Sequence, residues 1–208
     1  MSGFHIDFSD LDNIRESAGA TRSQMIAAFN RALKRTTAKL QRESVALMIG
    51  ETAVKGKSRV NKRVRSFTER AAGTDKNPGT GKVWFGLNDM NVSDLKGGMR
   101  NPRGIKPKNR KRDEKGRFIS ERGSRGATFT PRGQGLHPTT FLNSFVGTVR
   151  GKKSIWIRSS SGHVNEAMLP IYHPMISSIE GDLFSDAGEM LMQYYEQDLR
   201  GRVAGGVK

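Results

Sequence analysis

The sequence predicts a single α+β domain, in which a long N-terminal helix and a C-terminal helix pack on a small, mainly antiparallel sheet. Three observations support this fold: a helical apolar period near the N-terminus, several short runs of alternating apolar residues after residue 80, and a basic stretch rich in glycine and proline. With 208 residues the chain is long enough for one core. The basic stretch, residues 97–138, is expected to be an extended arm, and residues 201–208 a flexible tail.

The long helix is predicted from Thr21 to Glu51, and a second helical stripe follows it as far as Ala71. Apolar residues recur at every seventh position, with two further residues three positions after the first two, which defines one face of a helix. Ser58 is placed to cap the second helical segment. The two stripes are Ile26, Phe29, Leu33, Thr36, Leu40 and Leu47, and then Val60, Val64, Phe67 and Ala71.

Short strands and a final helix are predicted from alternation, β-branched and aromatic residues, and turn signals. The clearest pair is a hairpin of Asn143–Val149 and Ser154–Arg158, joined by a four-residue connection. A second pair joins Lys82–Leu87 to Val92–Leu95. The other predictions are a strand at Phe4–Ser9, an extended segment at Leu169–Pro174, where each proline disfavours helix at the residue before it, and a final helix at Leu183–Val203.

The net charge of +16 is concentrated in two blocks of the chain. Residues 22–70 carry 13 Lys and Arg against 3 Asp and Glu, and residues 100–132 add a further +9. Few of these cations can find an acidic neighbour along the chain, so a polyanion or an acidic protein partner is favoured over a merely solvated helix face. The chain has no cysteine, which excludes disulfides and thiolate chemistry, and no apolar run of membrane-spanning length.

The sequence lacks motifs for catalysis or for metal binding. The four histidines are scattered, and none stands at a metal-ligand spacing from another ligand residue. Gly79–Lys82 resembles a phosphate-binding loop only superficially, because Val83 replaces the required Ser or Thr and a strand follows instead of a helix. We therefore expect no catalytic residue, no metal and no cofactor.

The basic arm is the first candidate for a binding site. It has few aromatic residues, so phosphate contact without reading of the base sequence is favoured over base stacking. Arms of this composition also dock on acidic protein surfaces, and this alternative stays open. Only Arg117–Ser120 and Ala127–Thr130 have the pattern of strands within the arm. Our first choice for DNA or partner binding is the densest cluster, Lys106, Lys108, Arg110, Lys111, Arg112, Lys115 and Arg117, and the second choice is a basic helix face with Lys57, Arg59, Lys62 and Arg63.

A series of short motifs follows the predicted elements in order. Gln41–Thr52 ends the long helix, a basic segment and the Val83-Trp-Phe strand come next, and a C-terminal series contains Thr139–Phe145, Ile155–Arg158 and Leu169–Pro174. These motifs resemble the minor tail protein Z family, the tail completion proteins of long-tailed phages. Trp156 stands at the aromatic position of the second C-terminal motif, His173 replaces a more usual glycine, and the insertion from Lys96 to Pro138 is less typical of the family.

The resemblance implies a structural role at the head-proximal end of a phage tail. It implies a homo-oligomeric ring, of six copies by analogy, with the tail terminator, the tail tube and the head–tail connector as neighbours. Genomic double-stranded DNA would be contacted without sequence specificity, and the protein would reside in the virion after assembly in the host cytoplasm, with no membrane partner. The alternative is a sequence-independent nucleic-acid-binding protein. A nuclease or other enzyme is disfavoured because the carboxylate and histidine constellation is missing.

Overall fold

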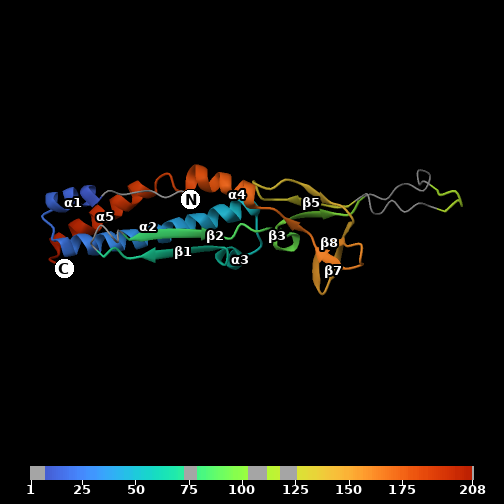
Figure 1. Cartoon of the computed structure of the whole chain (residues 1–208), viewed down its shortest axis with the longest axis horizontal. Helices are drawn as coiled ribbons and strands as arrows, with labels where there is room; N and C mark the ends of the chain where they lie inside the picture. Colours follow the sequence, from blue (N-terminus) through green and yellow to red (C-terminus); the bar gives the residue numbers. More distant parts are fainter. Residues whose placement is uncertain (1–7, 73–78, 103–111, 118–125, 208) are drawn as a thin grey trace. The chain divides into compact units, whose positions relative to one another are not determined.

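The computed structural model describes residues 8–72, 79–102, 112–117 and 126–207 (Figure 1). Over these residues the fold is α+β, with a long N-terminal helix, a C-terminal helix and small antiparallel sheets, which confirms the predicted class. The chain divides into two compact units. We call residues 1–47, 58–86 and 176–208 the helical unit, and residues 48–57 and 87–175 the strand unit.

The helical unit begins with α1 (Phe8–Ser17). Gly19 ends this helix with a φ of 63°, and the Ala20 N–H reaches back to the Arg15 carbonyl at 3.0 Å, a helix-ending bond that requires a left-handed residue. The strand predicted at Phe4–Ser9 is wrong where the structure describes it, because Phe8 and Ser9 are helical. Residues 4–7 lie outside the described residues.

Helix α2 (Arg22–Thr52) begins with a reciprocal cap. The Thr21 N–H donates to Gln24 Oε1 at 2.9 Å, and the Gln24 N–H donates to the Thr21 hydroxyl at 3.3 Å. The Gln24 side chain also donates to the Val207 carbonyl at 3.0 Å. The start of the long helix is therefore fixed by its own sequence and is tied to the end of the chain.

The core of the helical unit lies between α1, α2 and α5 (Ala187–Ala204). Tyr195 is fully buried, stands edge-on to Phe29 with ring centroids 6.4 Å apart, and donates its hydroxyl to the Leu11 carbonyl at 2.9 Å. Burial, with a smaller contribution from the Asp12 charge, raises the pKa of Tyr195 to about 12. In the predicted α2 stripe, Phe29, Leu33, Thr36 and Leu40 are buried, whereas Ile26 and Leu47 are only partly buried.

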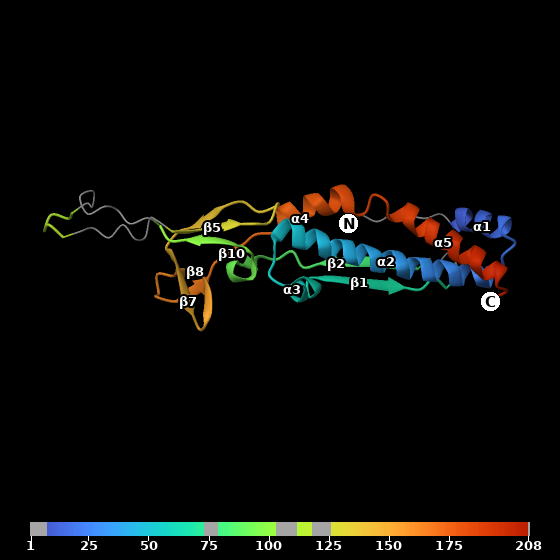
Figure 2. The ribbon, with the colours of Figure 1, turned by 180° about the vertical axis from the view of Figure 1, so that it is seen from behind.

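A two-stranded antiparallel ribbon, β1 (Val64–Glu69) and β2 (Thr80–Phe85), packs along α2 (Figures 1 and 2). Gly81 allows the close approach, since a Cβ at this position would overlap the Thr37 hydroxyl. The Ser66 hydroxyl donates to Gln41 on α2 at 2.7 Å. One face of the ribbon is therefore covered by α2.

Two predictions are wrong in this region. Residues 58–71 were predicted to form a second helix, but α3 (Lys57–Asn61) is one short turn with Ser58 inside it, and the strand β1 follows. β-branched and aromatic residues favour a strand here, and pairing with β2 satisfies the backbone, so tertiary contact overrides the apparent helical period. The pairing of Lys82–Leu87 with Val92–Leu95 is also wrong, because β2 pairs with β1 and Val92–Asp94 forms a 3₁₀ turn, η1.

The strand unit contains three small antiparallel sheets and the last turn of α2. The predicted hairpin is confirmed, but its connection is only two residues, Arg150 and Gly151, with φ of 50° and 76°. Two consecutive positive φ values match the tight turn that twisted hairpins favour. The sheets are β4 (Gly97–Arg100), β5 (Ala127–Pro131) and β6 (Thr139–Phe141); β7 (Ser144–Val149), β8 (Lys152–Arg158) and β9 (Val164–Glu166); and β3 (Met90–Asn91) with β10 (Met168–Leu169).

Glu166 joins β8 and β9 to η1 through a charged network. Its carboxylate accepts from Lys152 Nζ at 2.7 Å, from the Ser154 hydroxyl at 2.7 Å and from the Ser93 N–H at 3.1 Å. Burial acts to raise the pKa of Glu166, but the hydrogen bonds from Lys152, Ser93 and Ser154 together outweigh it and leave the pKa below its ordinary value. The charged form of this side chain therefore stabilises the strand unit.

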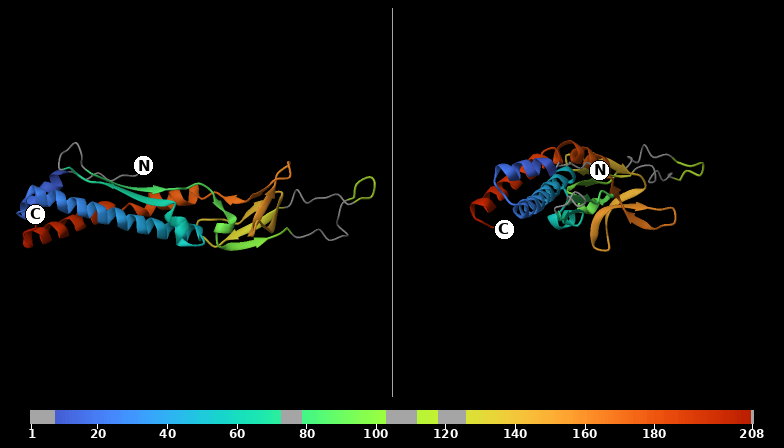
Figure 3. Two further views of the ribbon diagram at one scale, coloured as in Figure 1. Left: turned by 90° about the horizontal axis from the view of Figure 1, so that it is seen from below. Right: turned by 60° about the vertical axis from the view of Figure 1, so that its left-hand side comes forward.

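The C-terminal helical stretch has three parts: α4 (Tyr172–Ser178), a π-helical turn (Ile179–Leu183) and α5 (Figure 3). The extended segment predicted at Leu169–Pro174 is wrong from Tyr172 onward. Pro174 lies in the first turn of α4, where a helix needs no N–H donor, so it does not prevent the helix. The predicted final helix is confirmed, although α5 itself begins at Ala187.

Candidate functional site

The first-choice cluster lies only partly within the described residues. Lys106, Lys108, Arg110 and Lys111 lie outside them. The structure brings the other three cations, Arg112, Lys115 and Arg117, together on one reverse turn.

Asp113 holds this turn together. Its carboxylate accepts from the N–H groups of Lys115 and Arg117 at 3.0 and 2.8 Å, and its Oδ2 lies 3.1 Å from Arg117 Nε. The Gly116 N–H donates to the Asp113 carbonyl at 2.9 Å, and Arg112 donates to the Gly116 carbonyl at 2.8 Å. Two of the three cations are therefore engaged within the turn, and residues 112–117 have a net charge of only +1, three basic against two acidic side chains.

At the base of the arm, β4 and β5 form an antiparallel pair, with Arg100 opposite Thr128. The strand predicted at Ala127–Thr130 is confirmed. Gly126 precedes it at a point where a Cβ would overlap the Phe141 carbonyl, so the backbones touch there. Residues 97–100 and 127–131 of the predicted extended arm are therefore paired strands of one sheet, and residues 112–117 form a reverse turn.

The second-choice cations lie on and just after α3, and they differ in what they contact. Lys57, Arg59 and Lys62 are exposed. Arg63 is partly buried and donates to the Gly86 carbonyl at 3.0 Å, so it ties α3 to the end of β2. Lys57 and Lys62 make no ion pair with any acidic side chain that the structure describes.

The face of the ribbon that points away from α2 was missed as a site, and we call it the ribbon face. Arg65 lies opposite Trp84, and Phe67 lies opposite Lys82, so that two cations and two aromatic rings alternate. Phe67 is 54% exposed and Trp84 51% exposed, which is unusual for such large rings. The period-two alternation of side chains along residues 64–68 and 81–85 could have predicted this surface from the sequence. The interpretation of residues 58–71 as helix concealed it.

A second surface of the helical unit is acidic. From Tyr172 to Leu199 the sequence has six Asp and Glu and no Lys or Arg. Asp198 pairs with Arg31 at 3.2 Å and with Arg202 at 2.7 Å, so its charge is already partnered within the unit. Glu180, Asp186 and Glu189 are exposed and pair with no described cation; we call these three residues the acidic edge.

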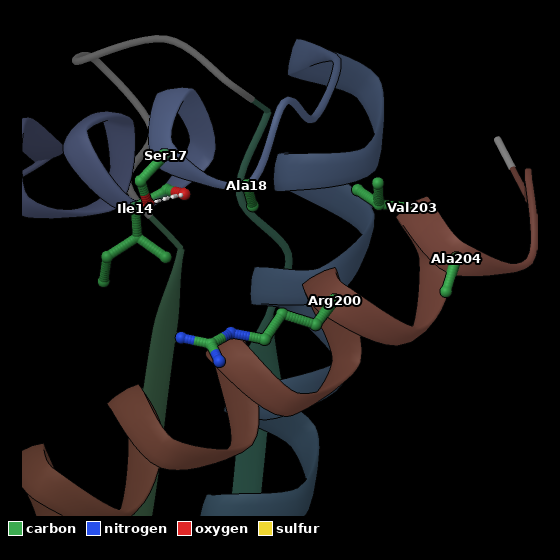
Figure 4. A pocket seen from close by; sticks show the side chains of 6 residues that line it. All are labelled: Ile14, Ser17, Ala18, Arg200, Val203 and Ala204. Carbon is green, nitrogen blue, oxygen red and sulfur yellow. Dashed lines mark hydrogen bonds between the residues drawn. The ribbon is translucent and has the colours of Figure 1, made fainter.

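A shallow hollow of about 520 Å³ lies between the end of α1 and the last turns of α5 (Figure 4). Arg200 extends toward α1 along it, and it is held by Glu196 at 3.5 Å. The Ser17 hydroxyl donates to the Ile14 carbonyl of its own helix at 2.9 Å. The polar groups here are satisfied locally, and the other lining residues are Ala18, Val203 and Ala204.

Within residues 8–72, 79–102, 112–117 and 126–207, no three His, Asp or Glu side chains gather closely enough to hold a metal ion. No helix in the same residues combines the length and the apolar character needed to cross a bilayer. Compared with protein-family models, with curated proteins and with solved structures, the chain matches none.

Proposed function

We propose that this protein is a non-enzymatic tail completion protein of a long-tailed phage, which forms a ring at the head-proximal end of the tail and contacts double-stranded DNA without reading its sequence. The proposal takes its biological setting from the motif series that ends in Leu169–Pro174. Its physical support is the cationic surface of residues 57–70.

One observation carries the DNA contact: cations are concentrated around α3 and β1, where the described residues offer few acidic partners. Residues 57–70 contain six Lys and Arg and one acidic residue, Glu69, which accepts from the Thr80 hydroxyl at 3.1 Å. Lys57 and Lys62 are free to approach phosphates, and phosphate contacts give affinity without sequence information.

A ring explains why such a small surface would suffice. Each copy offers only a few phosphate contacts, so one copy alone binds weakly at physiological salt. When several copies are held together, each further contact is effectively intramolecular, and the combined affinity rises by orders of magnitude. Weak binding by the single chain and tight binding by the assembly are the signature of this function.

The test combines the mass of the assembly with its affinity for DNA. Native mass spectrometry over a range of concentrations should show a cyclic oligomer, and fluorescence anisotropy with random-sequence duplexes should show affinity that rises with assembly and is equal for different sequences. Electron microscopy of the virion neck should place the copies around the tail axis. Copies unrelated by that axis would exclude the ring.

The alternative function is a sequence-independent nucleic-acid-binding protein that acts by itself. The same free cations favour it. It predicts tight binding at physiological salt by a monomer or dimer, with no gain on assembly, and this result would replace the tail proposal.

A further inference from the structure

The ribbon face and the acidic edge are complementary in charge and lie on different sides of the helical unit. The ribbon contacts α2 at Thr37 and Gln41, and Ala71, just after β1, contacts Asn30. Helix α5 contacts another face of α2, where Arg31 pairs with Asp198 and Arg35 lies 4.3 Å from the centre of the Tyr194 ring. One copy of the chain therefore presents both surfaces at once, and neither covers the other.

Glu189 of the acidic edge also lies at about the same height along α2 as the ribbon. Helix α5 runs antiparallel to α2, as the contacts of Gln24 with Val207 and of Arg35 with Tyr194 require. Glu189 precedes Tyr194 by five residues, or about 7.5 Å of helix, which places it near residue 40 of α2. On the ribbon side, Val64 and Ser66 contact Gln41, and Gly81 contacts Thr37.

We propose that the ribbon face binds the acidic edge of a second copy of this chain. Arg65 and Lys82 of one copy pair with Glu180, Asp186 and Glu189 of the next, while Phe67 and Trp84 are covered between them. Aromatic and arginine side chains are the residues that most often anchor protein interfaces. The inference rests on the proposed function for the closure of the ring, but the contact itself is argued from these residues alone.

The contact is heterologous, because each copy uses two different surfaces. Repeating such a contact gives a closed ring when its rotation closes and an open filament when it does not. Because Glu189 and the ribbon lie at about equal height along α2, the contact needs little displacement along α2 from copy to copy, which favours a closed ring whose axis runs along α2. Lys57 and Lys62 are not used in the contact and stay available for DNA.

The acidic edge decides between a protein and a nucleic acid as the occupant of the ribbon face. Exposed aromatic rings beside cations also suit single-stranded nucleic acid, whose bases can stack on them. A nucleic acid, however, would leave the acidic edge without a partner, whereas a second copy satisfies both surfaces. The nucleic acid is kept as an outcome of the test.

The test reverses each surface separately. One variant carries Arg65→Glu and Lys82→Glu, and the other carries Glu180→Lys and Glu189→Lys; Asp186 is left intact because it precedes α5 directly. Each variant alone should self-associate at least about 100-fold more weakly than wild type, since like charges then meet. An equimolar mixture should assemble again, because both mixed contacts are complementary, and should contain equal numbers of each variant in alternation by native mass spectrometry.

Trp84 gives a second readout that does not depend on the charge variants. Trp156 is only 8% exposed, so in a Trp156→Phe chain the remaining tryptophan, Trp84, reports directly on the ribbon face. Its emission should shift to the blue and become protected from quenchers as the protein concentration rises. The matched control, Lys57→Glu with Lys62→Glu, should assemble normally and lose DNA affinity.

The outcomes separate this inference from the proposed function. If wild type and both reversed variants assemble equally well, the ring stands and this contact is wrong. If wild type stays monomeric at every concentration, with and without duplex, the ring itself fails and the contact fails with it. If ribbon reversal abolishes binding of a single-stranded oligonucleotide but leaves assembly unchanged, the ribbon face is a nucleic-acid surface.

Discussion

Two basic regions that the structure describes use their charges in different ways: residues 57–70, which include the four second-choice cations, and the turn at 112–117, which carries three of the seven first-choice cations. In the turn, Arg117 pairs with Asp113 and Arg112 holds the Gly116 carbonyl, so the cations stabilise the turn itself. Around α3 and β1, Lys57 and Lys62 pair with no described acidic side chain. Residues 57–70 are therefore a better candidate than the turn for binding a polyanion, although their cations were ranked second from the sequence.

This difference shows that the availability of cations for binding a polyanion depends more on the acidic residues within the basic segment than on the number of cations. Asp113 and Glu114 interrupt the second region, and an acid one to four residues away is close enough to neutralise a cation. The first region has no acid before Glu69, and that carboxylate is occupied by Thr80. Four predictions test this comparison, from the largest expected effect to the smallest.

Replacing Gly81 with alanine should destabilise residues 57–70 by displacing the ribbon from α2. The added Cβ would overlap the Thr37 hydroxyl, and overpacking of this kind costs about 1–3 kcal/mol, or several degrees in Tm. Thermal unfolding checks this, with Gly98→Ala as the control because nothing lies near a Cβ there. A Thr37→Ala second substitution should restore part of the loss, and equal stability of Gly81→Ala and Gly98→Ala would contradict the packing.

Removing the free cations should weaken DNA binding more than removing those of the turn. In Lys57→Gln with Lys62→Gln, the slope of log affinity against log salt should decrease by about 1.8, or about 0.9 for each phosphate that is no longer neutralised. In Lys115→Gln with Arg117→Gln the decrease should be about half of that, because Lys115 alone counts in full and Arg117 is already paired with Asp113. Anisotropy titrations between about 50 and 200 mM salt measure both, and equal slopes for the two variants would refute the comparison.

Parts of the fold could be predicted because the signal was local. The α2 period, the hairpin around residues 150–151 and the final helix depend on neighbours in sequence, and the structure confirms them. The segment 58–71 failed because its apolar spacing fits one helix face while its residue types favour a strand, and only the distant partner β2 decides between the two. The pairing of β1 with β2 spans a connection that no local pattern reveals.

The candidate site was predicted less well than the fold. Which cations stay unpaired depends on tertiary contacts, such as that between Arg63 and the Gly86 carbonyl. The ribbon face depends on a register that places Arg65 opposite Trp84, and this register cannot be known before the strand is recognised. The acidic composition of residues 172–199 is visible in the sequence, but its position on another side of α2 is not.

A cation of the strand unit should serve stability instead of binding. Lys152→Gln removes the charged partner of Glu166 and should cost about 1 kcal/mol or less, because the pair is partly exposed, while the salt slope of DNA binding stays unchanged. The folded-state pKa of Glu166 is lowered, so its contribution is present above the ordinary value of 4.5 and is lost as pH falls through the folded pKa. Urea titrations at several pH values should therefore show a stability loss on acidification that is smaller in Lys152→Gln.

The smallest expected effect comes from freeing the cations of the turn. Asp113→Ala removes the acceptor of the Lys115 and Arg117 N–H groups and the ion-pair partner of Arg117. Overall stability should change little, because the turn is exposed, but trypsin should cleave after Lys115 and Arg117 faster than in wild type. DNA affinity at low salt should rise slightly and its salt slope should steepen by up to about 0.9, since Arg117 can then contact a phosphate.

Asp113→Asn is the matched control, because its amide oxygen can still accept the two backbone N–H groups while the charge is removed. If the asparagine variant gains DNA affinity and keeps its resistance to trypsin, neutralisation by Asp113 is what separates the two basic regions; if neither variant gains affinity, the turn does not face DNA at all.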